Sequence, residues 1–334
     1  MRETVEAAGF SSQTMESPQQ TPTGSLQIRN ILCPVDFSEF SSVAFRYANV
    51  LAYHFGARIF LHHTLQTPQN LLLGTMDATV VQGAFDAERL NQKDKLASMM
   101  ELAGAEHQEI VPLTNEGEPI TNILEIIKAQ NIDLVVMGTH GHKGFNRLVL
   151  GSVTEQVIHE ATCPVLVVSK TGLRKGGFIT PSSLEPLPLR TILLATDFSA
   201  ASDRAVTYAL RWASEWQGKV VVFHAVEAVP PITQGRVDLF PEYNPSFEQQ
   251  IARAWEKVRY LVPETAGKTC EVAYEIRHGH PKEEILRVAE EKSADLIVMG
   301  ARGFGKGSHA WGSNSSAVVR AGSFPVLVVR QLSG

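Results

Sequence analysis

The stretch Asp133-Leu-Val-Val-Met-Gly138 occurs again, with one change, as Asp295-Leu-Ile-Val-Met-Gly300. Each copy is a continuous apolar run between an acidic residue and a glycine, which is typical of a strand buried on both faces of a parallel sheet. Four other blocks recur in the same order at a spacing of 161 or 162 residues: Ile31–Ser38 with Ile192–Ser199, Ile59–His62 with Val221–His224, Gly117–Pro119 with Gly279–Pro281, and Cys163–Val168 with Phe324–Val329. These matches indicate that the chain contains two copies of one domain.

Helical patterns alternate with the apolar runs in both copies. After Asp36-Phe-Ser38, apolar residues recur at helical spacing from Val43 to Ala52, and Ser38 or Ser41 is placed to cap that helix. The second copy has the same stripe from Ala205 to Trp216, in which we expect the aromatic residues to fill the core. Strand and helix in alternation, joined by right-handed crossovers, predict two doubly wound α/β sheets.

The composition predicts how the chain divides. Residues 1–27 are rich in Ser, Thr, Gln, Glu and Pro, which is typical of a disordered tail. Residues 171–188 are dominated by Gly, Ser and Pro, as expected of a linker. We therefore expect one domain over residues 28–170 and a second over residues 189–334.

Charge and cysteine content exclude several classes of protein. The formal net charge of -5 argues against a nonspecific nucleic-acid binder, which usually carries a basic stripe. No apolar run approaches the roughly 20 residues of a membrane span, and the N-terminal segment does not resemble a secretory signal. The three cysteines, Cys33, Cys163 and Cys270, are too few and too scattered for a disulfide framework. We expect a cytoplasmic protein that acts at neither membranes nor nucleic acid.

A glycine pattern follows the strand that ends at Met137. It reads Gly138, two residues, Gly141, nine residues, then Gly151 and Ser152 at the start of a helix. Glycines let a backbone approach a phosphate closely, and the free N–H groups of a helix start favour an anion. The pattern predicts a phosphate site at the carboxyl edge of the sheet. The alternative is a plain turn followed by a helix cap.

Three of these features together resemble the universal stress protein family: the strand that ends in Val35-Asp36-Phe-Ser38, the glycine pattern, and the closing Cys163–Val168. The resemblance covers residues 28–169 and 189–331. It implies a five-stranded parallel α/β sheet, of the adenine nucleotide alpha hydrolase-like type, in each copy. Family members with the intact glycine pattern bind ATP, so the resemblance also implies ATP, with Mg²⁺, in the first copy.

The resemblance also assigns roles to individual positions. Pro34 and Asp36 would meet the adenosine end, and His63 would hold adenine through its backbone. His63 departs from the aliphatic residue that is usual there, which would make the pocket wall more polar. Met137 and Gly138 would flank the ribose. The phosphates would be held by Gly141, Gly151, Ser152 and Val153.

The second copy departs further from the glycine pattern. Gly300 and Gly303 are followed by eight residues, not nine, before Gly312 and Ser313, and Asn314 stands where the first copy has Val153. The shorter loop predicts a weaker phosphate site. Asp197 matches Asp36, and either carboxylate can instead serve only as a cap for the next helix. The stretch Gly300–Gly307 is not a P-loop, because Gly307 lacks the hydroxyl that would bind magnesium.

Other chemistries find little support. Adjacent His62 and His63 would point to opposite faces of a strand, so they do not make a shared metal site. No nucleophile–base signature is present. The expected function is a nucleotide-dependent regulatory module with protein partners, and slow ATP hydrolysis at most. The alternatives are a nucleotide-free scaffold and an ATP-using enzyme.

The final strand of each copy predicts how the copies associate. In the family, dimers often pair through this strand, here Pro164–Val168 and Pro325–Val329. An uncovered edge strand invites such pairing. We expect the two copies to pack as a pseudo-dimer. The sequence leaves open whether two chains then associate as a homodimer.

Overall fold

A computed structural model describes residues 27–65, 78–102, 109–139, 150–169, 189–227, 232–233, 236–237, 245–301 and 312–330. The predicted linker, residues 171–188, and nearly all of the predicted tail, residues 1–27, lie outside these ranges. Within them, no helix combines the length and the apolar character needed to cross a membrane.

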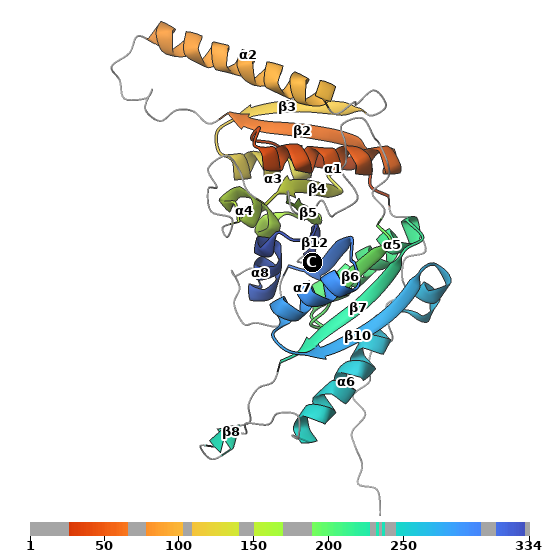
Figure 1. Ribbon diagram of the computed structural model, residues 1–334. Helices are drawn as coiled ribbons and strands as arrows, with labels where there is room; N and C mark the ends of the chain where they lie inside the picture. The colour runs from red at the N-terminus through yellow and green to blue at the C-terminus, as the bar shows by residue number, and fades with distance from the viewer. Residues whose placement is uncertain are drawn as a thin grey trace, which may run out of the picture.

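Each half alternates strands and helices, as the repeat predicts (Figure 1). The elements of the first half are β1 (Asn30–Pro34), α1 (Glu39–Phe55), β2 (Arg58–Leu65), α2 (Ala78–Leu102), β3 (Ile110–Glu116), α3 (Pro119–Ala129), β4 (Leu134–Gly138), α4 (Ser152–Glu160) and β5 (Val165–Val168). The second half has β6 (Thr191–Ala195), α5 (Ala200–Glu215), β7 (Lys219–Val226), β8 (Ile232–Thr233), β9 (Arg236–Val237), α6 (Pro245–Leu261), η3 (Glu264–Lys268), β10 (Glu271–His278), α7 (Pro281–Glu291), β11 (Leu296–Gly300), α8 (Ser313–Ala321) and β12 (Val326–Val329). The strands β8 and β9 form a separate two-stranded sheet.

The ten main strands form one sheet in the order β10-β7-β6-β11-β12-β5-β4-β1-β2-β3. Within each half the five strands are parallel, which confirms the predicted fold class. The halves join through β5 and β12, which run antiparallel with Leu166 opposite Leu327. Figure 1 shows β5 and β12 at the middle of the molecule, with β3 and β10 at the two outer edges. The two predicted sheets are therefore merged into one mixed sheet, and the final strands pair within the chain.

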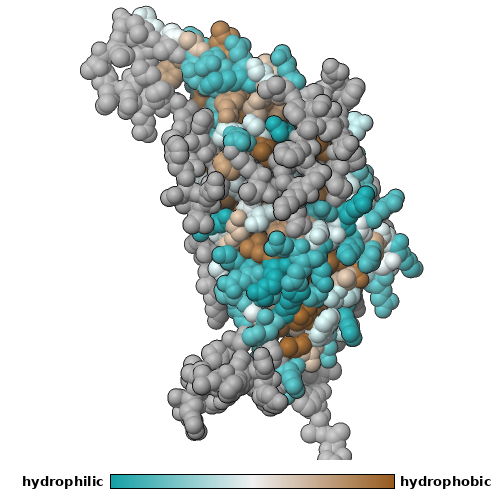
Figure 2. Space-filling model, viewed as in Figure 1, coloured by the Kyte–Doolittle hydropathy of each residue, from teal (hydrophilic) through white to brown (hydrophobic). Residues whose placement is uncertain are grey.

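Helices cover both faces of the sheet. Residues of α1, α2, α5 and α6 share one hydrophobic core with the strands, and residues of α3, α4, α7 and α8 share the other. The central strands are buried on both faces, which is why their sequences are continuously apolar. The outer surface of α7 is hydrophilic (Figure 2). The three cysteines are all unpaired thiols, as their scatter predicts.

The first helix shows how local sequence sets the boundaries of an element. Ser38 is the N-cap of α1, because its side chain accepts a hydrogen bond from the backbone N–H of Ser41. The helix ends at Phe55, and its C-cap is Gly56, whose φ of 63° places it in the left-handed region that glycine occupies without strain. Ser199 caps α5 in the same way.

The C-terminal ends of α1 and α5 meet across the junction of the two halves. The ring of His54 stacks on Trp216 with centroids 4.4 Å apart, and Phe55 packs edge-on against Trp216 at 5.4 Å. Trp212 is buried in the core, as the helical stripe predicts. Trp216, which was also expected in the core, instead packs at the junction between the halves, against His54 and Phe55. On the opposite face Arg320 of α8 lies 3.1 Å from Glu155 of α4. The halves therefore pack as the expected pseudo-dimer.

Candidate functional site

The candidate site lies at the carboxyl end of β1 and β4. These neighbouring strands mark the point where the strand order of the first half changes direction, which is where open α/β sheets bind ligands. Leu32 pairs with Val135, so Pro34, two residues further along β1, lies level with Met137. Met137 is buried in the core that α3 and α4 cover.

Asp36 shapes the turn between β1 and α1. Its Oδ1 accepts a hydrogen bond from the backbone N–H of Ser38 at 3.1 Å, and Phe37 between them has a φ of 62°. The equivalent Asp197 makes the same bond to Ser199 at 3.0 Å. An aromatic residue whose backbone lies in the left-handed region is strained, at a cost of about 1–3 kcal/mol. Phe198, the counterpart of Phe37 in the second half, has the same φ of 62°. Ser38 and Ser199 cap the helices, so each aspartate orders the turn that precedes the cap.

Gly138 and Gly300 are required by helix packing. A Cβ on Gly138 would lie 2.9 Å from the backbone of Phe40, at the start of α1. A Cβ on Gly300 would lie 2.9 Å from the backbone of Ala201 in α5. Neither glycine has a positive φ, so close approach, and not backbone freedom, explains why glycine stands there.

The N-terminus of α4 carries no side-chain cap. Gly151 is the N-cap residue, with φ -60° and ψ 134°, and its own N–H donates to the Thr139 carbonyl at 2.9 Å. The Thr154 hydroxyl donates to the Gly138 carbonyl at 2.9 Å, which ties the helix to the end of β4. The amides of Ser152 and Val153 thus lie beside the strand end with no side chain of the helix capping them.

The second half reproduces this arrangement. Gly312 donates its N–H to the Ala301 carbonyl at 3.1 Å, and the Ser315 hydroxyl donates to the Gly300 carbonyl at 2.8 Å. No side chain caps α8, which starts at Ser313. The loop that is one residue shorter therefore begins and ends in the same geometry as its counterpart. Gly141 and Gly303, in the middle of the two loops, lie outside the described residues.

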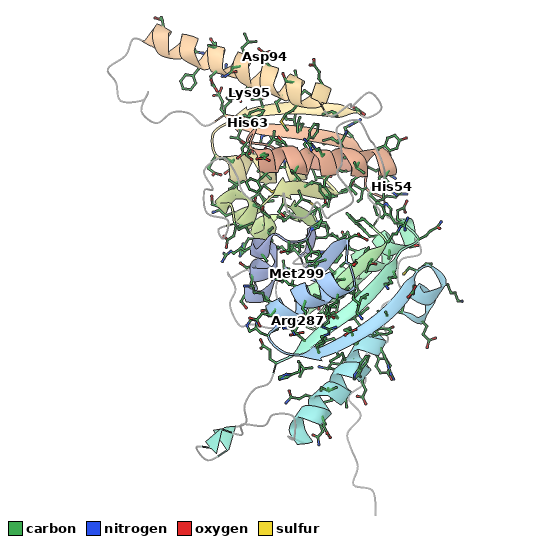
Figure 3. All side chains as sticks on the ribbon, in the orientation of Figure 1. His54, His63, Asp94, Lys95, Arg287 and Met299 are labelled. Carbon is green, nitrogen blue, oxygen red and sulfur yellow. The ribbon has the colours of Figure 1, made fainter. Side chains whose placement is uncertain are left out.

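His63 lies behind the Asp36 turn. Its Nδ1 is 2.8 Å from the Val35 carbonyl oxygen, and its ring lies 4.5 Å from that of Phe37. Lys95 of α2, labelled near His63 in Figure 3, places its ammonium group over the Phe37 ring. Burial lowers the pKa of His63 below its ordinary value, against the hydrogen bond to Val35. The imidazole therefore faces α1 and α2, and it does not line the wall that Met137 forms on the other face.

The same cluster recurs in the second half. His224 Nδ1 lies 2.8 Å from the Thr196 carbonyl oxygen, the tilted ring of Phe198 packs against it at 4.4 Å, and Lys257 lies over Phe198. His224 is thus the counterpart of His63, and the sequence alignment of His224 with His62 is wrong by one residue. Both copies therefore have a histidine at this place in the strand, His63 in the first half and His224 in the second.

The structure brings most of the predicted site residues together. Pro34, Asp36, Met137, Gly138, Gly151, Ser152 and Val153 gather at one strand edge, and Asp197, Gly300, Gly312 and Ser313 gather at the matching edge. Sequence reasoning missed Thr154 and Ser315, whose hydroxyls fix the helix starts. Their repetition 161 residues apart was the signal that could have identified them. Among the residues described, no group of three His, Cys, Asp or Glu side chains is arranged to hold a metal ion.

Comparisons with known proteins agree with this fold. The model of the universal stress protein family matches residues 27–169 and again residues 188–330. A universal stress protein of Thermus aquaticus is 39% identical over 142 residues, which are 42% of this chain and 98% of the relative. One from Mycolicibacterium smegmatis is 28% identical over 309 residues and spans 90% of this chain and 96% of its own length. The crystal structure of a universal stress protein from Archaeoglobus fulgidus superposes with a TM-score of 0.60 at 24% identity, covering 90% of this chain and 96% of that one.

Proposed function

Because this chain belongs to the universal stress protein family, with one domain of the family in each half, we propose that it binds ATP and acts as a nucleotide-dependent regulatory module. The domains extend over residues 28–170 and 189–334, with residues 171–188 as the linker. The protein works in the cytoplasm, where protein partners, not yet identified, respond to its nucleotide state.

One observation supports the proposal above the others: α4 begins without a side-chain cap at the carboxyl end of the central strands. Its first amides and the positive end of its dipole are available to the phosphates. Ser152 adds a hydroxyl at the first helical position. Gly151 and Val153 contribute backbone N–H groups, and Gly141 completes the cradle from the loop.

The adenosine end rests on the strand edge. Pro34 and Met137 lie level with each other on the face that α3 and α4 cover, and Asp36 fixes the turn beside them. Gly138 borders the ribose, and the backbone of His63 meets the base. Mg²⁺ accompanies the nucleotide, with phosphate oxygens and water as its main ligands.

The second half holds a weaker site. Asp197, Gly300, Gly312 and Ser313 occupy the same positions as their counterparts. The loop that contains Gly303 is one residue shorter, so fewer of its amides reach the phosphates. We expect the nucleotide affinity of this site to be lower than that of the first half.

The family is generally non-catalytic, and we propose that ATP is hydrolysed slowly if at all. A nucleotide-free scaffold is the second candidate function. It is favoured by the glycines at 138 and 300, which helix packing alone already explains.

The two functions are separated by mass spectrometry of ligand released from freshly purified protein, followed by calorimetric titration with MgATP. We expect adenine nucleotide in the wild type and at least a tenfold loss of affinity in Gly151→Val, because a branched side chain blocks the phosphates at the helix start. Gly151 has a φ that valine adopts readily, so the variant should unfold like the wild type. Gly312→Val is the matched control, since it alters only the second half. No released nucleotide and no heat of binding in the wild type would favour the scaffold, and unchanged affinity in Gly151→Val would mean that nucleotide does not bind at the start of α4.

A further inference from the structure

One ion pair links the open start of α4 to the other half of the molecule. Arg320, in the last turn of α8, has its Nη2 3.1 Å from Oε1 of Glu155, in the first turn of α4. The side chains of Arg320 and Glu155 are 44% and 41% exposed, and exposed pairs of this kind contribute little to stability. The pair can instead change the charge beside the proposed phosphate site.

Glu155 is an unfavourable charge for an anion at this helix start. It is the fourth residue of α4, and its backbone N–H donates to the carbonyl of the N-cap Gly151 at 2.9 Å. Helical side chains lean toward the N-terminus, so its carboxylate lies within roughly 10 Å of phosphates held by the amides of Ser152 and Val153. A carboxylate in the first turn stabilises the helix, but it repels a bound polyphosphate.

A second contact holds the end of α8 against the first half. The carbonyl oxygen of Gly322, the C-cap of α8, accepts a hydrogen bond from the hydroxyl of Ser169, which is buried. Ser169 directly follows β5, and Val168 at the end of β5 accepts the N–H of Thr139 at 2.9 Å. Thr139 is the first residue after β4. The end of α8, two residues from Arg320, is therefore fixed beside the strand end from which the proposed phosphate loop starts.

The repeat does not place the same pair in the second half. Ser316 stands at the position of Glu155, and His159 stands at the position of Arg320, in each case 161 residues away. The first turn of α8 consequently contains no acidic residue, whereas that of α4 contains Glu155. The ion pair therefore lies beside one of the two proposed phosphate sites, and its cation comes from the opposite half.

We propose that Arg320 is a positioning residue that acts across the junction: by holding and neutralising the Glu155 carboxylate, it raises the affinity of the first half for nucleotide. The inference rests on the proposed nucleotide function, and it adds control of the first site by the second half. Because coupling between two binding events is reciprocal, nucleotide in the first half also strengthens the contact between Arg320 and Glu155. The first site is complete only while α8 stays docked.

The test uses the full-length chain with methyl-labelled methionine, because Met137 in β4 and Met299 in β11 report the two halves separately in one NMR spectrum. MgATP is titrated at about 20 mM and at about 500 mM salt, where screening is weak and strong. In low salt we expect Arg320→Gln to weaken binding at Met137 about threefold, the effect of one charge roughly 10 Å from a doubly charged ligand. Glu155→Gln should strengthen it by a similar factor. Both differences should disappear in high salt, which a purely structural defect would not do.

Three further proteins serve as controls. The double variant of Glu155→Gln and Arg320→Gln should return to the wild-type affinity, because the two charge changes offset each other. Arg320→Lys keeps the positive charge and should bind like the wild type. His159→Gln makes the corresponding change at the repeat position, in the last turn of α4, and should leave binding at Met137 unchanged.

The outcomes separate this inference from the proposed function. Equal affinities of the wild type and Arg320→Gln in low salt, or a loss that persists in high salt or in the double variant, would overturn the role of Arg320 while leaving nucleotide binding intact. If MgATP shifts neither methionine in the wild type, the proposed function fails and the role of Arg320 fails with it.

Discussion

At the scale of single residues, the two halves show which details the fold requires and which are free to differ. Phe37 and Phe198 share the same strained backbone, and His63 and His224 make the same bond to a backbone carbonyl. Strain that recurs in both copies is held by its surroundings, here by an imidazole and a lysine that both contact the phenylalanine ring. His62 differs, because its counterpart Phe223 is apolar.

His62 should make the stability of the protein depend on pH. Burial lowers its pKa to about 4, well below the ordinary value near 6.5, so between these values the unfolded chain binds a proton that the folded chain does not. The free energy of unfolding should therefore fall as the pH drops from about 6.5 to about 4, by about 3 kcal/mol from this group. Denaturant unfolding across this pH range measures the slope.

His62→Phe supplies the matched comparison, since the second half has phenylalanine at that place. The variant should show a shallower loss of stability in acid than the wild type. Parallel pH profiles for the two proteins would show that His62 is not buried in its neutral form.

At the scale of elements, helix starts fall into two kinds. Serine side chains cap the N-termini of α1 and α5. Glu118 caps α3, because its Oε2 accepts hydrogen bonds from the backbone N–H groups of Ile120 and Thr121 at 2.7 and 3.1 Å. The helices α4 and α8 begin at glycine with no side-chain cap. A cap stabilises a helix start, and an open start is available to a ligand. Because α7 also begins without a side-chain cap, at His280, it is the position of α4 and α8 beside the central strands β4 and β11 that sets their starts apart.

The Glu118 cap should contribute measurably to stability. Glu118→Ala leaves two amides of α3 without a partner, and we expect a loss of about 1 kcal/mol in the free energy of unfolding. Glu125→Ala, on the exposed side of the same helix, should change it by less than about 0.5 kcal/mol. Chemical denaturation of the three proteins tests this, and equal losses for the two variants would contradict it.

At the scale of the whole molecule, the antiparallel pair of β5 and β12 turns two domains into one sheet. This pairing joins the two copies through their final strands, as expected, and it leaves β3 and β10 at the outer edges of the sheet. The cluster of His54, Phe55, Trp212 and Trp216 joins α1 to α5 beside the pair. The halves should therefore unfold together.

Trp216 tests this coupling. Trp216→Ala removes the ring that stacks on His54 and packs against Phe55, and we expect a loss of about 2–3 kcal/mol, since the side chain is half-buried. Trp255→Ala, a half-buried tryptophan of α6 away from the junction, should cost less. Thermal unfolding should show one transition in the wild type and two in Trp216→Ala. One shared transition in every variant would mean that the aromatic cluster does not couple the halves.

The sequence by itself determined the two copies, the parallel α/β class, the final-strand pairing and the strand edge where the site residues gather. The copies, the fold class and the strand edge follow from apolar runs, helical spacing, the glycine pattern and the repeat itself, whereas the final-strand pairing was implied by the resemblance to the family. The same signals predicted that Ser38 or Ser41 would cap α1, and the cap is Ser38.

Only the tertiary structure decided the rest. It showed that Gly138 is needed for the approach of Phe40, that His224 matches His63, and that Trp216 belongs to the junction. It also brought Asn122 to Thr64, 58 residues away in the chain. Each of these depends on which surfaces meet across the sheet, and the spacing of residues along one strand or helix does not contain that information.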